Sequence, residues 1–459
     1  MSRKEQKQIK PFDPKRFGVK WSSHYTSIIL HTTMIGYLTY YCTNSLGLSA
    51  GLTGMILLIS KILDAFTDAV GALVIERTDT KMGKARPYVL MMPLCWILTL
   101  IFFSQPIIAS TTGKAFFLFF MYFMINSVCL TMVNVAEPVF LARALENPDD
   151  SSSVLSVSGL IASVIAIVAG VVLPILLEKW ENIPHGWLML TAVVAIPGIV
   201  LSLIRFFSVH EKKDATYSVE EKPKFKVKDY FRVLGQNKHV LLLLLVQIMY
   251  GLSSGTGPAT TYYFKYVIGS IGMSGLVGAF CIPGMLTLAL VPKLKQKMPV
   301  KKIMMFGLAI GSLGGALRLI PSIPVLCVAS VFSAIGALPV GMLMPAMLID
   351  CMDLHEWKTG ERVEAVFGSM NSLANKLGVG LSSALLGGVL SIAGFNADLE
   401  IQTASANTAI IFAYAAIPMI LYAVMLLLLF LYKADRDLPQ ARAALAAEKT
   451  KNTNPREVK

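Results

Sequence analysis

Charged residues are scarce in this chain of 459 residues: they make up 15% of it, against roughly 25% in a typical soluble domain. Hydrophobic residues make up 55%, and the mean hydropathy is +0.63. Such a composition over such a length excludes an ordinary water-soluble domain. It predicts an all-α integral membrane protein that crosses the bilayer several times.

Cysteine patterns and metal or nucleotide motifs are missing as well. No CxxC pair and no Cys/His spacing indicates a metal site or a disulfide framework, and the sequence has neither an HExxH motif nor a Walker A loop. We therefore expect a protein that is not an enzyme and has no resident cofactor. We interpret the six dispersed cysteines as small packing residues: Cys42, Cys95, Cys129, Cys281, Cys327 and Cys351.

Long apolar runs are what the chain does contain. They recur from about residue 22 to residue 433, whereas a signal peptide would supply only one. The first 20 residues hold seven basic residues and no apolar core, so we interpret them as a polar tail. The pattern predicts twelve transmembrane helices, at 22–43, 48–76, 87–109, 113–143, 153–178, 186–208, 239–267, 271–292, 301–320, 323–350, 363–394 and 404–433.

Basic residues concentrate in the segments that would lie on one side of the membrane. They gather in both tails and in 77–86, 212–238 and 293–302, whereas the opposite loops carry few, namely Lys114, Lys179, Lys265 and Arg318. This asymmetry follows the positive-inside rule and predicts a multi-pass protein of the inner or plasma membrane with both termini in the cytosol. It also explains the net charge of +13 without a nucleic-acid partner.

A polar, lysine-rich segment at 210–238 divides the predicted helices into two sets of six. We therefore expect an N-terminal lobe at 1–209, a cytosolic linker at 210–238 and a C-terminal lobe at 239–459. This is the layout of a major-facilitator transporter, whose two lobes rock around a binding site near the middle of the membrane.

Two acids lie in the second predicted helix. Asp64 and Asp68 are four residues apart, so they share one helix face, and Thr67 neighbours that face. Each charge costs about 2.5–3.5 kcal/mol at the centre of a membrane helix, and two acids repel unless a cation or a shared proton relieves them. We interpret the pair as a site for Na⁺ or H⁺. The alternative is a structural ion pair between Asp64 and Lys61, which leaves the second acid unexplained.

A basic residue lies equally deep in the other half. Lys376 is about 20 Å into the predicted helix 363–394, too far from its end to reach water easily. A lysine there is expected to face a wet cavity or an acid. An acid pair in one lobe and a lysine in the other is what a binding site shared between the lobes requires.

Four stretches of the sequence resemble the glycoside–pentoside–hexuronide cation symporters, the family of melibiose permease. They are "LDAFTDAVGALVIERTDTKMGKARPY" (63–88), "TYYFKYVIG" (261–269), "IDCMDLHEWKTGERVEAVFGS" (349–369) with its run Glu361, Arg362 and Glu364, and "NKLGVGL" (375–381). The resemblance implies that Asp64, Asp68, Thr67 and Thr131 bind the cation, and that Lys376 links the cation and sugar sites. It also implies a motif that latches the lobes on the cytosolic side: Arg77, Asp79, Gly83, Lys84 and Arg86.

The chain departs from this family at the sugar site. Asn134 stands where the family has a sugar-binding aspartate, the first helix has no aspartate, and "SSSVLSVSGLIASV" lacks the family's arginine. Candidates for a rebuilt site are Asn126, Asn134, Glu137, His31 and Lys61, together with Lys376. His31 is alternatively a packed hydrogen-bonding residue, and Glu137 is alternatively an ion-pair partner of Arg143.

These features predict a cation-coupled secondary symporter that imports a sugar, glycoside or sugar acid by alternating access. Its partners would be the sugar, a monovalent cation and the lipid bilayer, and it would act as a monomer. Two alternatives remain: a carrier of a non-sugar solute such as a lysolipid, and a sensor that has lost transport.

Overall fold

The structure is a computed structural model that describes residues 13–145, 147, 150–211, 232, 234–235, 237–361 and 363–453. Within these residues the regular structure is helical, and the one β-type contact is an isolated bridge between Thr80 and Gly83. The predicted all-α class is confirmed.

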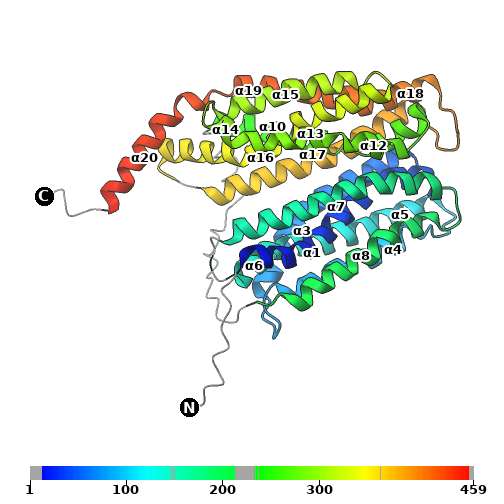
Figure 1. The fold of residues 1–459 in the computed structure, drawn as a ribbon, viewed down its shortest axis with the longest axis horizontal. Coiled ribbons are helices and arrows are strands. Elements are labelled where there is room, and N and C mark those ends of the chain that lie inside the picture. Colours follow the sequence, from blue (N-terminus) through cyan, green and yellow to red (C-terminus); the bar gives the residue numbers. More distant parts are fainter. Residues whose placement is uncertain are drawn as a thin grey trace, which may run out of the picture.

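The first half of the chain forms a group of helices that lie together in Figure 1. Its elements are α1 (Pro14–Ile35), α2 (Leu38–Asn44), α3 (Ala50–Arg77), η1 (Arg86–Leu90), α4 (Met91–Phe102), α5 (Thr111–Tyr122), the π-helix η2 (Phe123–Leu130), α6 (Thr131–Ala144), α7 (Ser151–Trp180) and α8 (Gly186–Ser208).

The second half forms the other group, which packs along the first (Figure 1). Its elements are α10 (Lys238–Ser254), α11 (Ala259–Tyr263), the π-helix η4 (Phe264–Ile268), α12 (Gly272–Ala279), α13 (Cys281–Leu286), η5 (Thr287–Leu290), α14 (Val291–Lys295), α15 (Val300–Leu317), α16 (Ile323–Thr359), α17 (Glu364–Ile392), α18 (Ala404–Ile411), the π-helix η6 (Phe412–Ala416), α19 (Ile417–Leu431), η7 (Ala434–Arg436) and α20 (Leu438–Thr453).

Within the described part of the chain, nine helices are long and apolar enough to cross a membrane, and they match nine of the expected spans. The other three expected spans, 22–43, 48–76 and 87–109, hold α1 with α2, the 28-residue α3, and η1 with the shorter apolar α4. At 1.5 Å per residue, α3 is about 42 Å long, which exceeds the thickness of the hydrocarbon core.

Hydroxyl and carboxylate side chains cap several of these helices. The Asp13 carboxylate accepts hydrogen bonds from the first backbone N–H groups of α1, and Ser49 and Ser110 do the same for α3 and α5. These side chains satisfy N–H groups that have no partner inside the helix. A glycine ends α16 at its C-terminus: Gly360 has a φ of +73°, a conformation that residues with a side chain rarely adopt.

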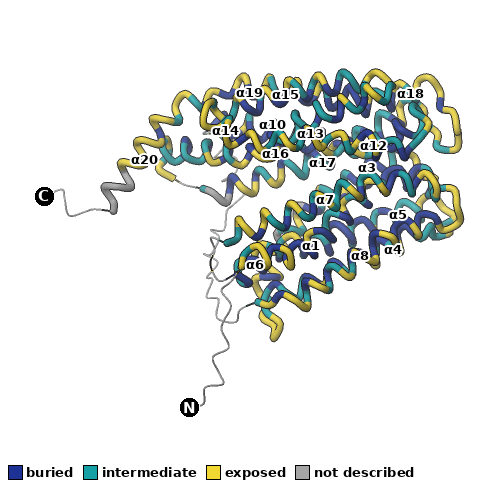
Figure 2. The backbone as a smooth tube through the Cα atoms, viewed as in Figure 1, coloured by how far each residue is buried: buried dark blue, intermediate teal, exposed yellow. Residues whose placement is uncertain are grey.

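Buried residues line the sides of the helices that face one another, and exposed apolar residues lie on the outward sides (Figure 2). On α3, for example, Phe66 is 68% exposed and Val70 is 56% exposed. Large apolar side chains on outward faces are expected where lipid takes the place of water.

Glycines allow α3 and α17 to approach across the boundary between the two halves. A Cβ atom at Gly387 would come closer than 3.0 Å to the Ala50 carbonyl oxygen, and one at Gly54 would meet the Ser383 carbonyl oxygen just as closely. Farther along the same contact, Gly380 lies against Lys61. Small residues therefore position α17 directly beside the charged part of α3.

Hydrogen bonds also join the halves at the helix ends away from the chain termini. The Thr43 hydroxyl lies 2.7 Å from the Tyr262 hydroxyl, and Asn44 Nδ2 donates to the Tyr266 hydroxyl at 2.6 Å. Lys265 forms an ion pair with Glu181, which also accepts a 2.6 Å hydrogen bond from the Tyr40 hydroxyl. We call these residues the end cluster: Tyr40, Thr43, Asn44, Glu181, Tyr262, Lys265 and Tyr266.

Candidate functional site

The two acids of α3 differ in their access to solvent. Asp64 is buried, with 6% of the residue exposed, whereas the Asp68 side chain is 37% exposed. Both lie on the face of α3 that meets α17. The helix thus presents one carboxylate in the interior and a second, one turn later, where solutes can reach it.

Each acid is paired with a lysine. Lys61 Nζ lies 3.2 Å from Asp64 Oδ2, so the structural ion pair considered from the sequence is present. Lys376, from α17, forms an ion pair with Asp68 and also donates to the Asp64 backbone carbonyl at 3.2 Å. Lys376 Nζ is 4.0 Å from Asp64 Oδ2 as well. Two acids and two lysines therefore form one charge-balanced cluster across the boundary between the halves.

Thr131 completes the cluster from a third helix. Its hydroxyl donates to Asp68 Oδ1 at 3.3 Å and is almost fully buried. Thr131 begins α6 immediately after the π-helix η2, whose wider turns rotate the following residues relative to a regular α-helix. Such π-helical turns are frequent at functional sites. The Thr67 hydroxyl points back to its own helix and donates to the Asp64 carbonyl at 3.1 Å.

One oxygen of the cluster has no hydrogen-bond partner. Asp64 Oδ1 is buried and unpaired within the described structure. A buried carboxylate oxygen without a donor is costly, and carboxylate and hydroxyl oxygens are suitable ligands for a hard cation. Across the described residues, no group of three or more His, Cys, Asp and Glu side chains could hold a metal ion.

Three other candidates lie elsewhere in the first half. His31 is fully buried between helices, with Nε2 at 2.9 Å from the Thr99 hydroxyl and its ring against Trp96. Asn126 is buried and donates to the Tyr122 carbonyl at 3.4 Å. Asn134 is exposed, one turn beyond Thr131 on α6. Of the three, Asn126 contacts the charge cluster, because its backbone carbonyl oxygen accepts a hydrogen bond from the Thr131 hydroxyl at 3.4 Å.

Glu137 has a different partner from the one expected. Its carboxylate accepts two hydrogen bonds from Arg205 of α8, at 2.8 and 2.9 Å, so the pairing with Arg143 is wrong. The Arg205 guanidinium is fully buried and stacks 3.3 Å from the centre of the Trp21 ring. This ion pair joins α6 to α8, and no sequence spacing connects residues 137 and 205.

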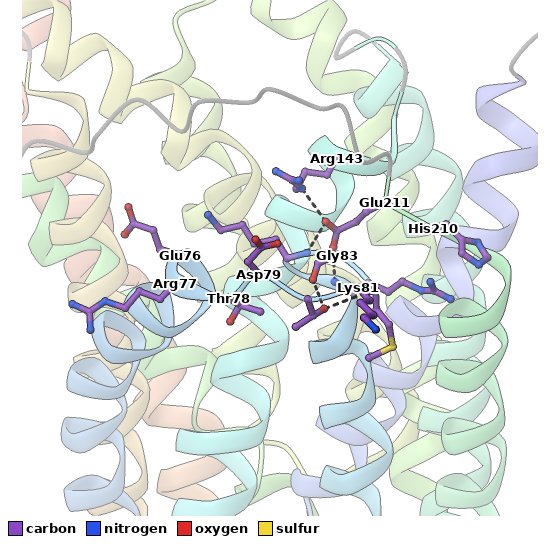
Figure 3. A pocket seen from close by; sticks show the side chains of 13 residues that line it. Glu76, Arg77, Thr78, Asp79, Lys81, Gly83, Arg143, His210 and Glu211 are labelled. Carbon is purple, nitrogen blue, oxygen red and sulfur yellow. Dashed lines mark hydrogen bonds and ion pairs between the residues drawn. The ribbon is translucent and has the colours of Figure 1, made fainter.

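The loop after α3 is held by Glu211, a residue that the sequence analysis assigned to the linker (Figure 3). The Glu211 carboxylate accepts hydrogen bonds from the backbone N–H groups of Lys84, Ala85 and Arg86, at 2.9, 2.6 and 2.6 Å. Arg143 forms an ion pair with the same carboxylate at 2.8 Å. The loop is therefore anchored within its own half of the protein.

The geometry of this loop requires Gly83. Its φ is +116°, and a Cβ atom there would come within 3.0 Å of the Glu211 carboxylate. Arg77 and Asp79 are exposed and line a cavity of about 860 Å³ beside the loop (Figure 3). The charged run that begins at Glu361 belongs to another stretch that resembles the family, residues 349–369. There Glu361 pairs with Arg232 at 3.2 Å, and Arg362 lies outside the described residues.

Two packed groups of membrane helices joined by ion pairs are the layout of a major-facilitator transporter. The nucleoside transporter NupG has this fold: it superposes with a TM-score of 0.62 at 14% identity, over 92% of this chain and 98% of that one. The chain belongs to the family described as MFS/sugar transport protein, whose model matches residues 24–436.

Curated relatives agree with this assignment. The chain is 26% identical over 421 residues to the isoprimeverose transporter of Lactiplantibacillus pentosus, covering 89% of this chain and 86% of that protein. It is also 26% identical over 413 residues to a putative glycoside/cation symporter of Escherichia coli (strain K12), covering 86% of each. The resemblance to the cation symporters found in the sequence is confirmed.

Proposed function

We propose that this protein imports a sugar, glycoside or sugar acid across the inner or plasma membrane together with Na⁺ or H⁺. The observation that carries the proposal is the ion pair of Lys376 in α17 with Asp68 in α3, beside Asp64 and across the boundary between the halves. The relatives support it, since they include an isoprimeverose transporter and a putative glycoside/cation symporter.

The charge balance of the cluster suggests how a cation couples to the substrate. Without a cation, Lys376 neutralises Asp68 and joins the two halves. A cation that enters between Asp64 Oδ1 and Asp68 Oδ1 replaces that neutralisation and frees the ammonium group for a substrate oxygen. The cation and the substrate then favour the same rearrangement of α3 against α17. Such coupling is reciprocal, because each ligand must raise the affinity for the other by the same factor.

The contacts between the halves favour a conformation open to the cytosol. The end cluster joins the halves at the ends away from the chain termini, which are the outer ends if both termini are cytosolic. Asp68 remains partly exposed. In this conformation the cation leaves from Asp68 into the cytosol, and import then requires the end cluster to open.

The proposal is tested with the full-length chain in proteoliposomes. Uptake of a panel of glycosides and hexuronates is measured under an imposed sodium gradient, an imposed proton gradient, and neither. We expect one of the two gradients to drive accumulation of at least one sugar above its external concentration. Sugar uptake that is identical in all three conditions would contradict cation coupling.

A further inference from the structure

A second cavity lies within the C-terminal group of helices, away from the acid pair. It has a volume of about 380 Å³, and α10, α11, α13, α16 and α19 contribute to its wall. Ser333 in this wall is ten residues from the start of α16, so the cavity reaches about 15 Å along the membrane-spanning part of that helix. The helix break between Ser254 and Ala259 opens space beside it.

The wall of this cavity is more apolar than polar, but it holds several hydroxyl groups and a single charge. Hydroxyl groups from Ser253, Ser330 and Ser333 line it, and Arg318 is the only charged residue among the described residues around it. The sequence predicts Arg318 in a loop, and the residue lies in the turn directly after α15. Its side chain lines the cavity, where the guanidinium lies 4.9 Å from the centre of the Tyr414 ring.

The Arg318 side chain lacks hydrogen-bond acceptors for part of its guanidinium group. Its Nε atom is buried without a hydrogen-bond partner in the described structure, and no acid stands within ion-pairing distance of it. The contact with Tyr414 compensates part of the charge but accepts no N–H. Arg318 directly follows the last residue of α15, and it is a cation that lines a cavity with no acid among the described residues of its wall. The group that would satisfy it is an oxyanion, because a guanidinium binds carboxylates and related anions through two parallel hydrogen bonds.

We propose that this cavity is a subsite for the anionic group, a carboxylate or a sulfonate, of a sugar-acid substrate. Arg318 supplies the paired N–H donors, and the serine hydroxyls donate to the remaining oxygens. The inference rests on the proposed transport function and narrows its substrate class. It also explains how a chain that lacks the family's sugar-binding acids in the first half could select a substrate with residues of the second half.

The wall of the cavity includes a glycine that allows a matched test. A Cβ atom at Gly278 would have no neighbour within 4 Å, so Gly278→Val fills space in the cavity without a clash of its Cβ. Gly159 in α7 is equally open at its Cβ but does not line the cavity. Gly159→Val is therefore the control for the added side chain, and Arg318→Gln removes the charge itself.

The experiment is calorimetric binding to the purified full-length chain in lipid nanodiscs. The probes are methyl β-glucuronide, a 6-sulfonated methyl glucoside and the uncharged methyl β-glucoside. We expect at least one anionic sugar to bind more tightly than the glucoside, and Arg318→Gln to weaken that binding by roughly 10- to 100-fold. Gly278→Val should weaken it as well, whereas Gly159→Val should not. The carboxylate and sulfonate probes distinguish the two oxyanions.

Several outcomes would overturn the subsite. These are equal binding of the charged and uncharged sugars, no detectable binding of either anionic probe, or a preference that survives both Arg318→Gln and Gly278→Val. Binding does not depend on an ion gradient, so this result is separate from the transport assay. If anionic sugars bind through Arg318 but no gradient drives uptake, cation coupling fails and the subsite stands.

Discussion

Lys376 and Asp68 belong to different halves of the protein, and their ion pair crosses the boundary between α17 and α3. Lys61, in contrast, pairs with Asp64 inside a single helix. A conformational change that separates the halves breaks the first pair and leaves the second intact. We therefore expect the two acids to have different tasks, with Asp64 staying paired to Lys61 while Asp68 changes partner.

Lys376→Ala should abolish accumulation of substrate while the chain still folds and inserts. Removing one partner of a fully buried ion pair costs about 3–5 kcal/mol; because this pair is partly exposed, a smaller cost falls on the conformation with α3 against α17. The measurement is gradient-driven uptake together with the thermal midpoint. Lys358→Ala, at an exposed lysine of α16, is the control. Wild-type accumulation by Lys376→Ala would make this lysine purely structural.

Gly387→Ala should hinder the close approach of α3 and α17. The new Cβ would come within 3.0 Å of the Ala50 carbonyl oxygen, and overpacking of this kind costs about 1–3 kcal/mol. We expect a lower thermal midpoint and a lower rate of uptake. The adjacent Gly388 is the matched control, since its Cβ would have no neighbour within 4 Å and Gly388→Ala should be neutral or slightly stabilising. Equal behaviour of the two variants would show that the helices separate freely at this contact.

The sequence predicted the fold and the acid cluster because both depend on local composition. Apolar runs of membrane length require helices whatever their neighbours. Asp64, Asp68 and Lys376 stand out because each is a charge inside such a run, and the structure brings all three together.

What the sequence could not predict depends on contacts between distant segments. Nothing in the sequence marks Arg205, near the end of α8, as the partner of Glu137, because packing of distant segments brings the two together. Glu211 looked like linker, but its carboxylate anchors the loop at Lys84. No residue pattern in the sequence predicts the π-helix before Thr131, yet this π-helix determines where the Thr131 hydroxyl points.

Glu181→Gln should destabilise the end cluster and favour the conformation that is open on that side. The substitution removes the ion pair with Lys265 and weakens the acceptor of the Tyr40 hydroxyl. A hydrogen bond to a charged group contributes about 1.5–3 kcal/mol, so we expect a shift of roughly tenfold or more in the conformational equilibrium. Alkylation of a cysteine introduced at Ser45, which lies beside the end cluster without belonging to it, measures that equilibrium from the outer side. Glu400→Gln, at an exposed acid near the same end, should leave the alkylation rate unchanged. No difference between the two variants would mean that the end cluster does not hold this conformation.

Asp68→Asn is the most direct test of the cation site. The variant keeps the size of the side chain and its ability to accept from Thr131, but it loses the charge that a cation and Lys376 would share. We therefore expect normal insertion, loss of cation-driven accumulation, and retained exchange of substrate down its own gradient. Asp64→Asn should also lose accumulation, and it should lower stability further, because Asp64 is buried and paired with Lys61. Uptake against imposed sodium and proton gradients then identifies the ion that the wild type uses. If both variants accumulate substrate as well as the wild type does under that gradient, the coupling cation binds elsewhere, and the charge cluster serves only to hold α3 against α17.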